Sequence, residues 1–243
     1  MAENKRNMLN EHFFRPKWYS VFINPYFISR RSLYGNFRMI IATIGTGKSV
    51  LDVGCGIKPY KDLFIGNNYV GMDIKGGGHA DFAKNADYYY DGKNFPFENE
   101  KFDVIFCTQV LEHSDEPGMI ITESYRVLKT GGIIICSAPF VYPEHEVPFD
   151  YLRFTKYGLE KMFLMCGFKI DQITQTTGIF GVFGQLFSAY IFELFKAKNI
   201  LVKIIKLFIV VFILSPIQIL SLFLDKIFRC RNVTLDYIVV AKK

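Results

Sequence analysis

Two glycines and an aspartate at strand ends carry the clearest chemical signal in this 243-residue chain. Residues 50–56 read VLDVGCG, an apolar strand that runs into a glycine turn, and Gly54 and Gly56 would let the backbone pass close beneath a bound ligand. Asp73 ends the next apolar run, 21 residues after Asp52, where a carboxylate can accept hydrogen bonds from both hydroxyls of a ribose. Together these residues predict a site for a nucleoside-bearing cofactor.

The sequence matches two other phosphate-binding motifs only in part. A dinucleotide fingerprint needs a third glycine where Pro59 stands, which disfavours NAD. Residues 45–49 read GTGKS and resemble the end of a phosphate-binding loop, but Ala42 replaces the first glycine of that motif and a strand follows instead of a helix. We therefore interpret residues 45–49 as a simple loop.

The usual spacings of metal ligands are also missing. His145-Glu146 resembles the start of a zinc-protease motif, but Phe149 occupies the second histidine position and Pro148 prevents the helix that would align the ligands. The cysteines are scattered, odd in number and without a C-x-x-C pair. They are Cys55, Cys107, Cys136, Cys166 and Cys230. We expect no metal site, no disulfide framework and a reducing compartment.

The segments that would position these residues alternate short apolar runs with helical stretches, as in a parallel sheet covered by helices. The runs that read as strands are 50–53, 69–72, 104–107, 133–136, about 168–177 and 237–240. We expect one helix to open at Pro117 and to close at Gly131-Gly132. A second helix should start after an N-cap at Thr155 and end at Gly167.

Five segments in this frame resemble, in order and spacing, motifs of class I S-adenosylmethionine-dependent methyltransferases of the type 11 group. They read DVGCG from Asp52, GMDI from Gly71, DGKNFPF from Asp91, FDVIFCTQVLEH from Phe102 and RVLKTGG from Arg126. The match covers roughly residues 48–177 and a last strand at 234–241. The segment PFDYLRFT from Pro148 also resembles one in members associated with surface-polysaccharide clusters. The resemblance implies a three-layer, Rossmann-like α/β fold with a mostly parallel seven-stranded sheet.

The resemblance further implies S-adenosyl-L-methionine as cofactor and assigns a set of residues to it. Those beside the methionine part would be Asp52, Gly54, Cys55 and Gly56. Asp73 would hold the ribose hydroxyls, Asp91 would hold the adenine amino group, and the stretch from Cys107 to Gln109 would line the donor site. Two acids at separate strand ends suit a ribose diol and an amino donor, because carboxylates only accept hydrogen bonds. Asp91 could instead be an ordinary turn residue before Gly92.

Methyl transfer from a sulfonium is a displacement at carbon, so the protein mostly positions donor and acceptor, and a hydroxyl or amine acceptor can need a base. His145, in a polar loop after the fifth strand, is our first candidate for that base, with His113 and Asp150 as further catalytic candidates. His113 could equally be a packing residue. Asp150, Tyr151 and Arg153 could bind a polar acceptor or anchor their loop.

The charges divide the chain into three segments. Residues 1–48 hold eight basic and two acidic residues, residues 49–195 hold 12 and 19, and residues 196–243 hold nine and two. An acidic middle argues against a nucleic-acid partner, and basic ends favour an anionic membrane surface, although solubility charge is the alternative. Basic residues interrupt every apolar run near the start, so we predict no signal peptide and a cytoplasmic location.

About fifty residues before the last strand are unusually apolar. Residues 207–224 hold no charge, and Pro216 should divide them into two arms too short to cross a bilayer individually. Because the last strand should rejoin the sheet, this insertion should dip into a membrane or lie flat on it. The basic residues that flank it are Lys196, Lys198, Lys203, Lys206, Lys226, Arg229 and Arg231. Alternatives are a homodimer interface and internal packing.

We thus predict four parts: an N-terminal basic and aromatic helical cap (1–47), a methyltransferase core (48–177), an apolar insertion (178–231) and a last strand (232–243). The predicted activity is methyl transfer to a hydroxyl of a glycan or lipid-linked saccharide at the inner membrane face. One alternative acceptor is a lipid-soluble small molecule such as a quinone precursor. The other alternative is a non-catalytic membrane adaptor, against which the intact Gly54, Gly56, Asp73 and Asp91 argue.

Overall fold

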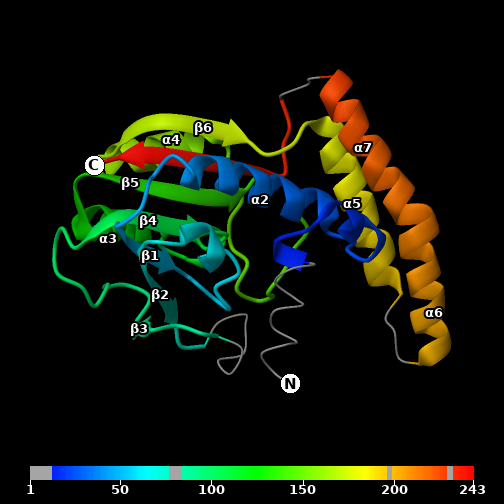
Figure 1. The fold of residues 1–243 in the computed structure, drawn as a ribbon, viewed down its shortest axis with the longest axis horizontal. Helices are drawn as coiled ribbons and strands as arrows, with labels where there is room; N and C mark the ends of the chain where they lie inside the picture. The colour runs from blue at the N-terminus through cyan, green and yellow to red at the C-terminus, as the bar shows by residue number, and fades with distance from the viewer. Residues whose placement is uncertain (1–12, 77–83, 196–198, 229–231) are drawn as a thin grey trace. The chain divides into compact units, whose positions relative to one another are not determined.

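The computed structural model describes residues 13–76, 84–195, 199–228 and 232–243 (Figure 1). The chain forms two compact units, which we call the sheet unit (Ile40–Thr174 and Asp236–Lys243) and the helical unit (Met1–Met39 and Gln175–Leu235). The predicted N-terminal cap and apolar insertion thus contribute to one unit. Cys230 and the predicted membrane contacts Lys196, Lys198, Arg229 and Arg231 lie outside the described residues.

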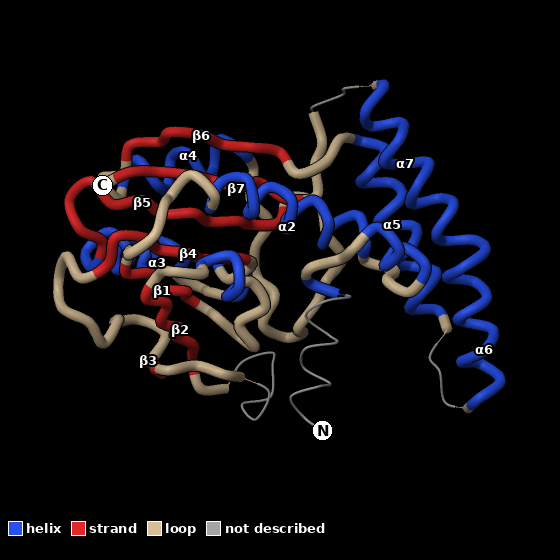
Figure 2. The backbone as a smooth tube through the Cα atoms, viewed as in Figure 1, coloured by secondary structure: helices blue, strands red, loops and turns tan. Residues whose placement is uncertain are grey.

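The sheet unit is built on seven strands in the order β3-β2-β1-β4-β5-β7-β6 (Figure 2). They are β1 (Ser49–Val53), β2 (Asn68–Ile74), β3 (Tyr88–Tyr90), β4 (Phe102–Thr108), β5 (Leu128–Pro139), β6 (Lys169–Gln175) and β7 (Asp236–Lys242). Strands β3, β2, β1, β4 and β5 pair in parallel, and β7 runs antiparallel to β5. Strand order reverses at β1, which has β2 on one side and β4 on the other, and such a switch point is where open α/β sheets bind ligands at their carboxyl edge.

Both faces of the sheet are covered, as the alternating strand residues require. On one face lie α3 (Pro117–Val127) and α4 (Lys156–Met165), which contact each other and enclose a core that includes Ile105 and Cys107. On the other face Phe106 packs against Tyr60 and against Phe64 of η3 (Lys61–Phe64), with ring centroids 5.8 and 5.4 Å apart. The predicted mostly parallel, Rossmann-like sheet with flanking helices is confirmed.

The predicted helix boundaries are only partly right. Thr155 is the N-cap of α4, where its side chain accepts a hydrogen bond from the Gly158 N–H, as expected. Helix α3 begins at Pro117 but ends at Val127, so the prediction that it runs to Gly131-Gly132 is wrong. Both glycines belong to β5, where a Cβ on Gly132 would lie 2.9 Å from the Asp103 carbonyl oxygen. Strand pairing, rather than a helix end, requires a glycine there.

The helical unit contains η2 (Trp18–Phe22), α2 (Phe27–Ile41), α5 (Ile179–Leu194), α6 (Ile200–Ile209), η6 (Val210–Leu214) and α7 (Ser215–Ile227). The last three form one uninterrupted helix, Ile200–Ile227, so the prediction that Pro216 divides it is wrong. Segment η6 is a π-helical turn whose i→i+5 bond, from the Ser215 N–H to the Val210 carbonyl, carries the helix into the proline. Pro216 lies in the first turn of α7 and has no backbone N–H. The hydrogen-bonding register set by the π-helical turn does not use that donor, so the helix tolerates the proline.

Buried polar side chains join the apolar helices of this unit to its N-terminal segment. The fully buried Gln185 accepts a hydrogen bond from the Ser29 N–H and donates one to the Pro25 carbonyl. The Ser215 hydroxyl donates to the Val21 carbonyl at 2.8 Å. Since such buried groups lose stability when left unpaired, these bonds fix the N-terminal segment to α5 and α7.

Asp225 of α7 caps the start of α5 and gives a first testable prediction. Its carboxylate accepts hydrogen bonds from the N–H groups of Gly178, Phe180 and Gly181 at 2.9 to 3.0 Å. Replacing Asp225 by alanine should lower the free energy of unfolding by about 2 kcal/mol, because three helix-end donors lose their acceptor. Urea unfolding followed by circular dichroism measures this. Lys226→Ala, at the neighbouring position, should change stability by less than about 0.5 kcal/mol, and equal losses in both variants would contradict the capping role.

Candidate cofactor and acceptor site

The glycine turn after β1 has the geometry that its sequence predicts. Gly54 and Gly56 have positive φ angles of 67° and 49°, which favour glycine. The Gly54 and Cys55 N–H groups donate to the Met72 carbonyl at 2.8 and 3.0 Å, so β1 and β2 hold the turn between them. A Cβ on Gly54 would lie 2.4 Å from the Val110 side chain, whereas one on Gly56 would meet nothing within 4 Å. The turn is thus closed on the Val110 side and open at Gly56.

Asp52 lies beneath this turn in a fully buried position. One carboxylate oxygen accepts a hydrogen bond from the Tyr69 hydroxyl, and the other has no hydrogen-bond partner among the described residues. Burial raises the pKa of Asp52 to about 7, and it raises the pKa of the Tyr69 hydroxyl as well. The family resemblance assigns Asp52 to the cofactor, but no sequence motif marks Tyr69, which lies 17 positions after Asp52.

Asp73 lies at the end of β2, as predicted, and binds the glycine turn directly. Its carboxylate accepts the Gly56 N–H at 2.8 Å and the Ile74 N–H at 2.8 Å. The ammonium of Lys84 lies 3.2 Å from the same carboxylate, and both side chains are nearly buried. Lys84 was not predicted, and it places a positive charge where the resemblance assigns the ribose hydroxyls.

A second unpredicted ion pair lies beside Gly71 of β2. Lys58, held at a φ of 58°, forms a 2.6 Å ion pair with Asp87, and the Asp87 carboxylate accepts the Gly71 N–H at 2.7 Å. Partial burial acts to raise the pKa of Asp87, but the bonds from Gly71 and Lys58 outweigh it and the pKa is lowered. The pair joins the segment after the glycine turn to the segment before β3.

Asp91 is exposed and binds its own turn. Its carboxylate accepts the N–H groups of Asn94 at 2.7 Å and Lys93 at 2.8 Å, bonds that lower its pKa. This is the turn role that the sequence analysis kept as the alternative. The predicted contact with the adenine amino group stays a prediction, in which the carboxylate would serve the turn and the ligand together.

The remaining cofactor candidates differ in what they can offer. The side chains of Cys55 and Cys107 are buried. Burial raises the pKa of the Cys55 thiol, and a hydrogen bond with Cys136 together with burial raises the pKa of the Cys107 thiol, so neither presents a thiolate. Cys107 lies in the core between the sheet and the helices that cover it. Gln109 has a φ of 54° and donates from its N–H to the Ser137 carbonyl and from its amide to the Ser137 hydroxyl. This fixes the turn that leads from β4 to His113.

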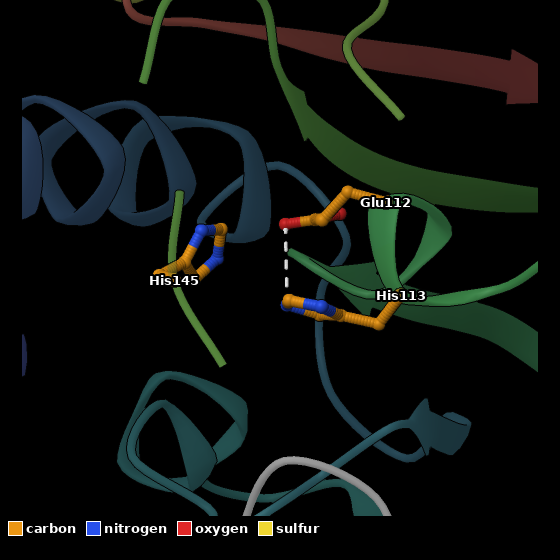
Figure 3. Close-up of side chains that lie close together, drawn as sticks. All are labelled: Glu112, His113 and His145. Carbon is orange, nitrogen blue, oxygen red and sulfur yellow. Dashed lines mark ion pairs between the residues drawn. The ribbon is translucent and has the colours of Figure 1, made fainter. Parts of the chain in front are cut away.

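The structure brings together two of the predicted catalytic residues, His113 and His145, with Glu112, which was not predicted. Glu112 and His113 lie on η5 (Leu111–His113), directly after β4, and His145 comes from the loop after β5; Figure 3 shows the Glu112 carboxylate and both rings pointing toward one another. The two imidazole centroids are 4.8 Å apart. Burial raises the pKa of Glu112 and lowers that of His145, so His145 is neutral near neutral pH.

Asp150 supports this cluster through its loop. Arg153 donates two hydrogen bonds to its carboxylate at 2.6 and 2.7 Å, and the carboxylate accepts the His145 N–H at 2.9 Å. Partial burial opposes the effect, but these bonds lower the pKa of Asp150 to about 2. Asp150 and Arg153 therefore anchor the loop that carries His145, and Asp150 also lies 3.2 Å from the His145 Nδ1.

The comparison with protein families identifies the type of domain. Residues 51–136, from β1 through the middle of β5, match the family described as a methyltransferase domain. This part of the chain is a class I S-adenosylmethionine-dependent methyltransferase domain. Its methyl donor is S-adenosylmethionine, and the residues present fit that group: Gly56 leaves open space, and the Asp73 carboxylate supplies acceptors beside it.

Curated proteins that are similar to this chain match only part of it. A ubiquinone biosynthesis O-methyltransferase of Pasteurella multocida is 32% identical over 112 residues, which are 38% of this chain and 46% of that protein. A malonyl-[acyl-carrier protein] O-methyltransferase of Yersinia pestis is 30% identical over 99 residues, 38% of this chain and 37% of that protein. The chain thus spans less than half the length of these relatives.

Solved structures share the fold of the methyltransferase domain at low identity. A SAM-dependent methyltransferase of Archaeoglobus fulgidus superposes with a TM-score of 0.54 and 16% identity, covering 88% of this chain and 94% of that one. The [4+2]-cyclase SpnF has the same TM-score and identity, covering 86% and 81%. The fold is therefore shown, and the chemistry has to be argued from the site.

Proposed function

We propose that this chain transfers the methyl group of S-adenosylmethionine to a hydroxyl of a glycan or lipid-linked saccharide. The observation that carries the proposal is the close approach of Gly54 to Val110, where a Cβ on the glycine would lie 2.4 Å from the valine side chain. This approach joins the cofactor turn to the segment that carries Glu112 and His113. Donor loop and polar cluster are then neighbours at one sheet edge, as a displacement between two bound reactants requires.

The acceptor cluster supports an oxygen nucleophile of a polar molecule. His113 and His145 are partly exposed, and the Asp150–Arg153 pair beside them keeps the loop in place. Both curated relatives described above are called O-methyltransferases. The saccharide as acceptor rests on the resemblance of residues 148–155 to members from polysaccharide clusters.

A quinone precursor is the second candidate acceptor. It is favoured by the similarity to the ubiquinone biosynthesis enzyme and by the apolar helical unit, which would suit an enzyme that meets a lipid-soluble substrate. Incubating labelled S-adenosylmethionine with membrane extracts and the purified chain, followed by mass spectrometry of the labelled product, separates the two. A labelled saccharide supports the first proposal, a labelled quinone precursor supports the second, and the absence of any labelled product contradicts both.

The cofactor site gives a second testable prediction. Asp73→Asn should weaken S-adenosylmethionine binding about 10- to 150-fold, equivalent to about 1.5–3 kcal/mol. The reason is that one carboxylate oxygen, which accepts hydrogen bonds, becomes an NH₂ group, which donates them and would face other hydrogen-bond donors. Isothermal titration calorimetry measures the dissociation constant. Asp171→Asn, an exposed change of the same chemistry on β6, should leave it unchanged. Equal affinity of the Asp73 variant and the wild type would remove Asp73 from the site.

We also propose that the helical unit attaches the enzyme to the inner face of an anionic membrane. The helix Ile200–Ile227 has a mean hydropathy of 2.6, and α6 has no buried residue. Its 28 residues span about 42 Å, long and apolar enough to cross a bilayer. However, β6 and β7 belong to one sheet, so the chain between them leaves that sheet and returns to it. An inserted or flat-lying hairpin of α5 with α6 and α7 satisfies both observations.

The charges of the described residues favour a lipid surface as the partner of this hairpin. Lys203 and Lys206 lie on α6 and Lys226 lies in the last turn of α7, while Asp225 is occupied in capping α5. A cationic helix with exposed aliphatic and aromatic side chains binds anionic interfaces by insertion and by attraction.

A further inference from the structure

Three potential metal ligands converge beside the cofactor turn although no ligand spacing in the sequence predicts them. Glu112 and His113 are adjacent on η5, and His145 lies 32 positions further along the chain. One donor atom from each lies within 4.8 Å of the other two. Their meeting depends on the fold, because parallel β4 and β5 deliver both segments to the same edge of the sheet.

The Glu112 carboxylate needs a partner that the described side chains do not give it. Its side chain is 0% exposed, and neither oxygen has a hydrogen-bond partner among the described residues. The positive charge of Arg153 acts on Glu112, but its guanidinium is hydrogen-bonded to Asp150. A buried acid without a donor is costly, and a metal ion is one of the few partners that offset that cost.

Both imidazoles have the orientation that metal-ligating histidines show. The His113 Nδ1 lies 2.7 Å from the Phe149 carbonyl, which only accepts, so Nδ1 carries the proton and Nε2 holds the free lone pair. That Nε2 lies 3.9 Å from a Glu112 oxygen. The His145 Nδ1 lies 3.2 Å from the Asp150 carboxylate, which leaves the lone pair of Nε2 to bind a metal ion. In metal sites, the ring nitrogen that does not bind the metal usually donates its hydrogen bond to such a carbonyl or carboxylate oxygen.

We propose that Glu112, His113 and His145 bind a divalent transition-metal ion, which in turn holds the oxygen of the methyl acceptor. Two imidazoles and one carboxylate favour zinc, manganese, iron or cobalt over magnesium or calcium. A tetrahedral site with bonds of about 2.1 Å needs ligand atoms about 3.4 Å apart, so ligand atoms that lie 4.8 Å apart have to approach by about 1.4 Å.

Three protein ligands leave coordination positions open for substrate. A hydroxyl bound to the ion would lose its proton to solvent water more readily, and its oxygen would be held for attack on the methyl carbon, with the sulfur of the donor leaving as a neutral thioether. The second half of this inference rests on the proposed methyl transfer, whereas metal binding itself does not. His145 would then serve as a ligand rather than as the base that the sequence analysis predicts.

Metal binding can be tested without activity. The full chain, freed of metal with a chelator, is titrated with Co²⁺ while its visible spectrum and the binding heat are followed. One equivalent should bind, with visible bands of nitrogen and oxygen coordination and no thiolate band from the cysteines. Glu112→Gln and, separately, His145→Asn should weaken binding at least about tenfold. Glu116→Gln, an exposed acid close by on the chain, is the matched control and should bind as the wild type does.

The outcomes separate the metal site from the methyltransferase proposal. Circular dichroism verifies that each variant is folded, and the partly exposed His145→Asn serves if Glu112→Gln does not fold. Wild type that binds no Co²⁺, or binds it equally well in the folded ligand variants, overturns the metal site, even if it still binds S-adenosylmethionine and transfers methyl groups. Metal binding without any loss of turnover in chelator-treated enzyme overturns the role of the ion in holding the acceptor.

Discussion

Replacing His145 by alanine is expected to lower the turnover number about 100-fold and to leave the dissociation constant for S-adenosylmethionine within about twofold of the wild type. The imidazole is the most exposed member of the Glu112, His113 and His145 cluster, so it is the one best placed to touch an acceptor. The carboxylates beside the cofactor turn, by contrast, come from Asp52 of β1 and Asp73 of β2. Single-turnover measurement of methyl transfer, beside calorimetry with the cofactor, measures both effects.

The matched control for this prediction is Glu144→Gln. Glu144 is the neighbouring residue on the same loop, it is exposed, and no hydrogen bond of the described residues joins it to the cluster. Its turnover should equal that of the wild type. A His145 variant that turns over normally when chemistry limits the rate would place the acceptor elsewhere. A variant that loses cofactor affinity as well would show that the loop shapes the donor site instead.

The frame of the cofactor site is predictable because it depends on local rules. Gly54 and Gly56 adopt positive φ angles, and Asp73 ends a strand, and both features follow from residue type and the position of apolar runs. The parallel strands follow from their continuous apolar character. Thr155 as N-cap likewise follows from one hydroxyl before a helical pattern.

The charged partners within the site were not predictable, because they come from long-range contacts with no motif. Lys84 reaches Asp73 from the far side of residues 77–83, and Lys58 pairs with Asp87 across 29 positions. The acceptor cluster is similar: His113 and His145 could each be judged from their own segments, but only the sheet brings them to one place. The spacing argument against a zinc-protease motif holds for a helix and says nothing of such a site.

The two errors in the helices have the same origin, since a local signal was overruled by its surroundings. Gly131 and Gly132 are typical of a helix end, yet they belong to β5, where close approach to Asp103 excludes a side chain on Gly132. Pro216 is typical of a break, yet the π-helical turn before it and the Ser215 hydroxyl, which donates to the Val210 and Val21 carbonyls, keep the helix continuous. Buried partners of the helical unit determine that outcome.

The helical unit should bind anionic vesicles, and removing its exposed apolar side chains should abolish this binding. Phe208, Phe212, Ile219 and Phe223 are between 49% and 63% exposed, so each still has about half of its surface to bury. At about 1 kcal/mol for each, replacing all four by serine should weaken vesicle binding about 1000-fold. Flotation of the full chain with vesicles of phosphatidylcholine and phosphatidylglycerol in equal parts measures the partition.

The matched control replaces four exposed apolar residues of the sheet unit by serine: Ile65, Met119, Leu164 and Met165. This variant loses similar apolar surface but should bind vesicles as the wild type does, because the attachment depends on the helix Ile200–Ile227. Vesicles of phosphatidylcholine alone should bind the wild type more weakly, since Lys203, Lys206 and Lys226 lose their anionic partners. The opposite result would be a wild type that binds neither kind of vesicle and that light scattering shows to be a dimer. If the fourfold serine variant of the helical unit is then a monomer, the exposed helix is a subunit interface and the membrane proposal is wrong.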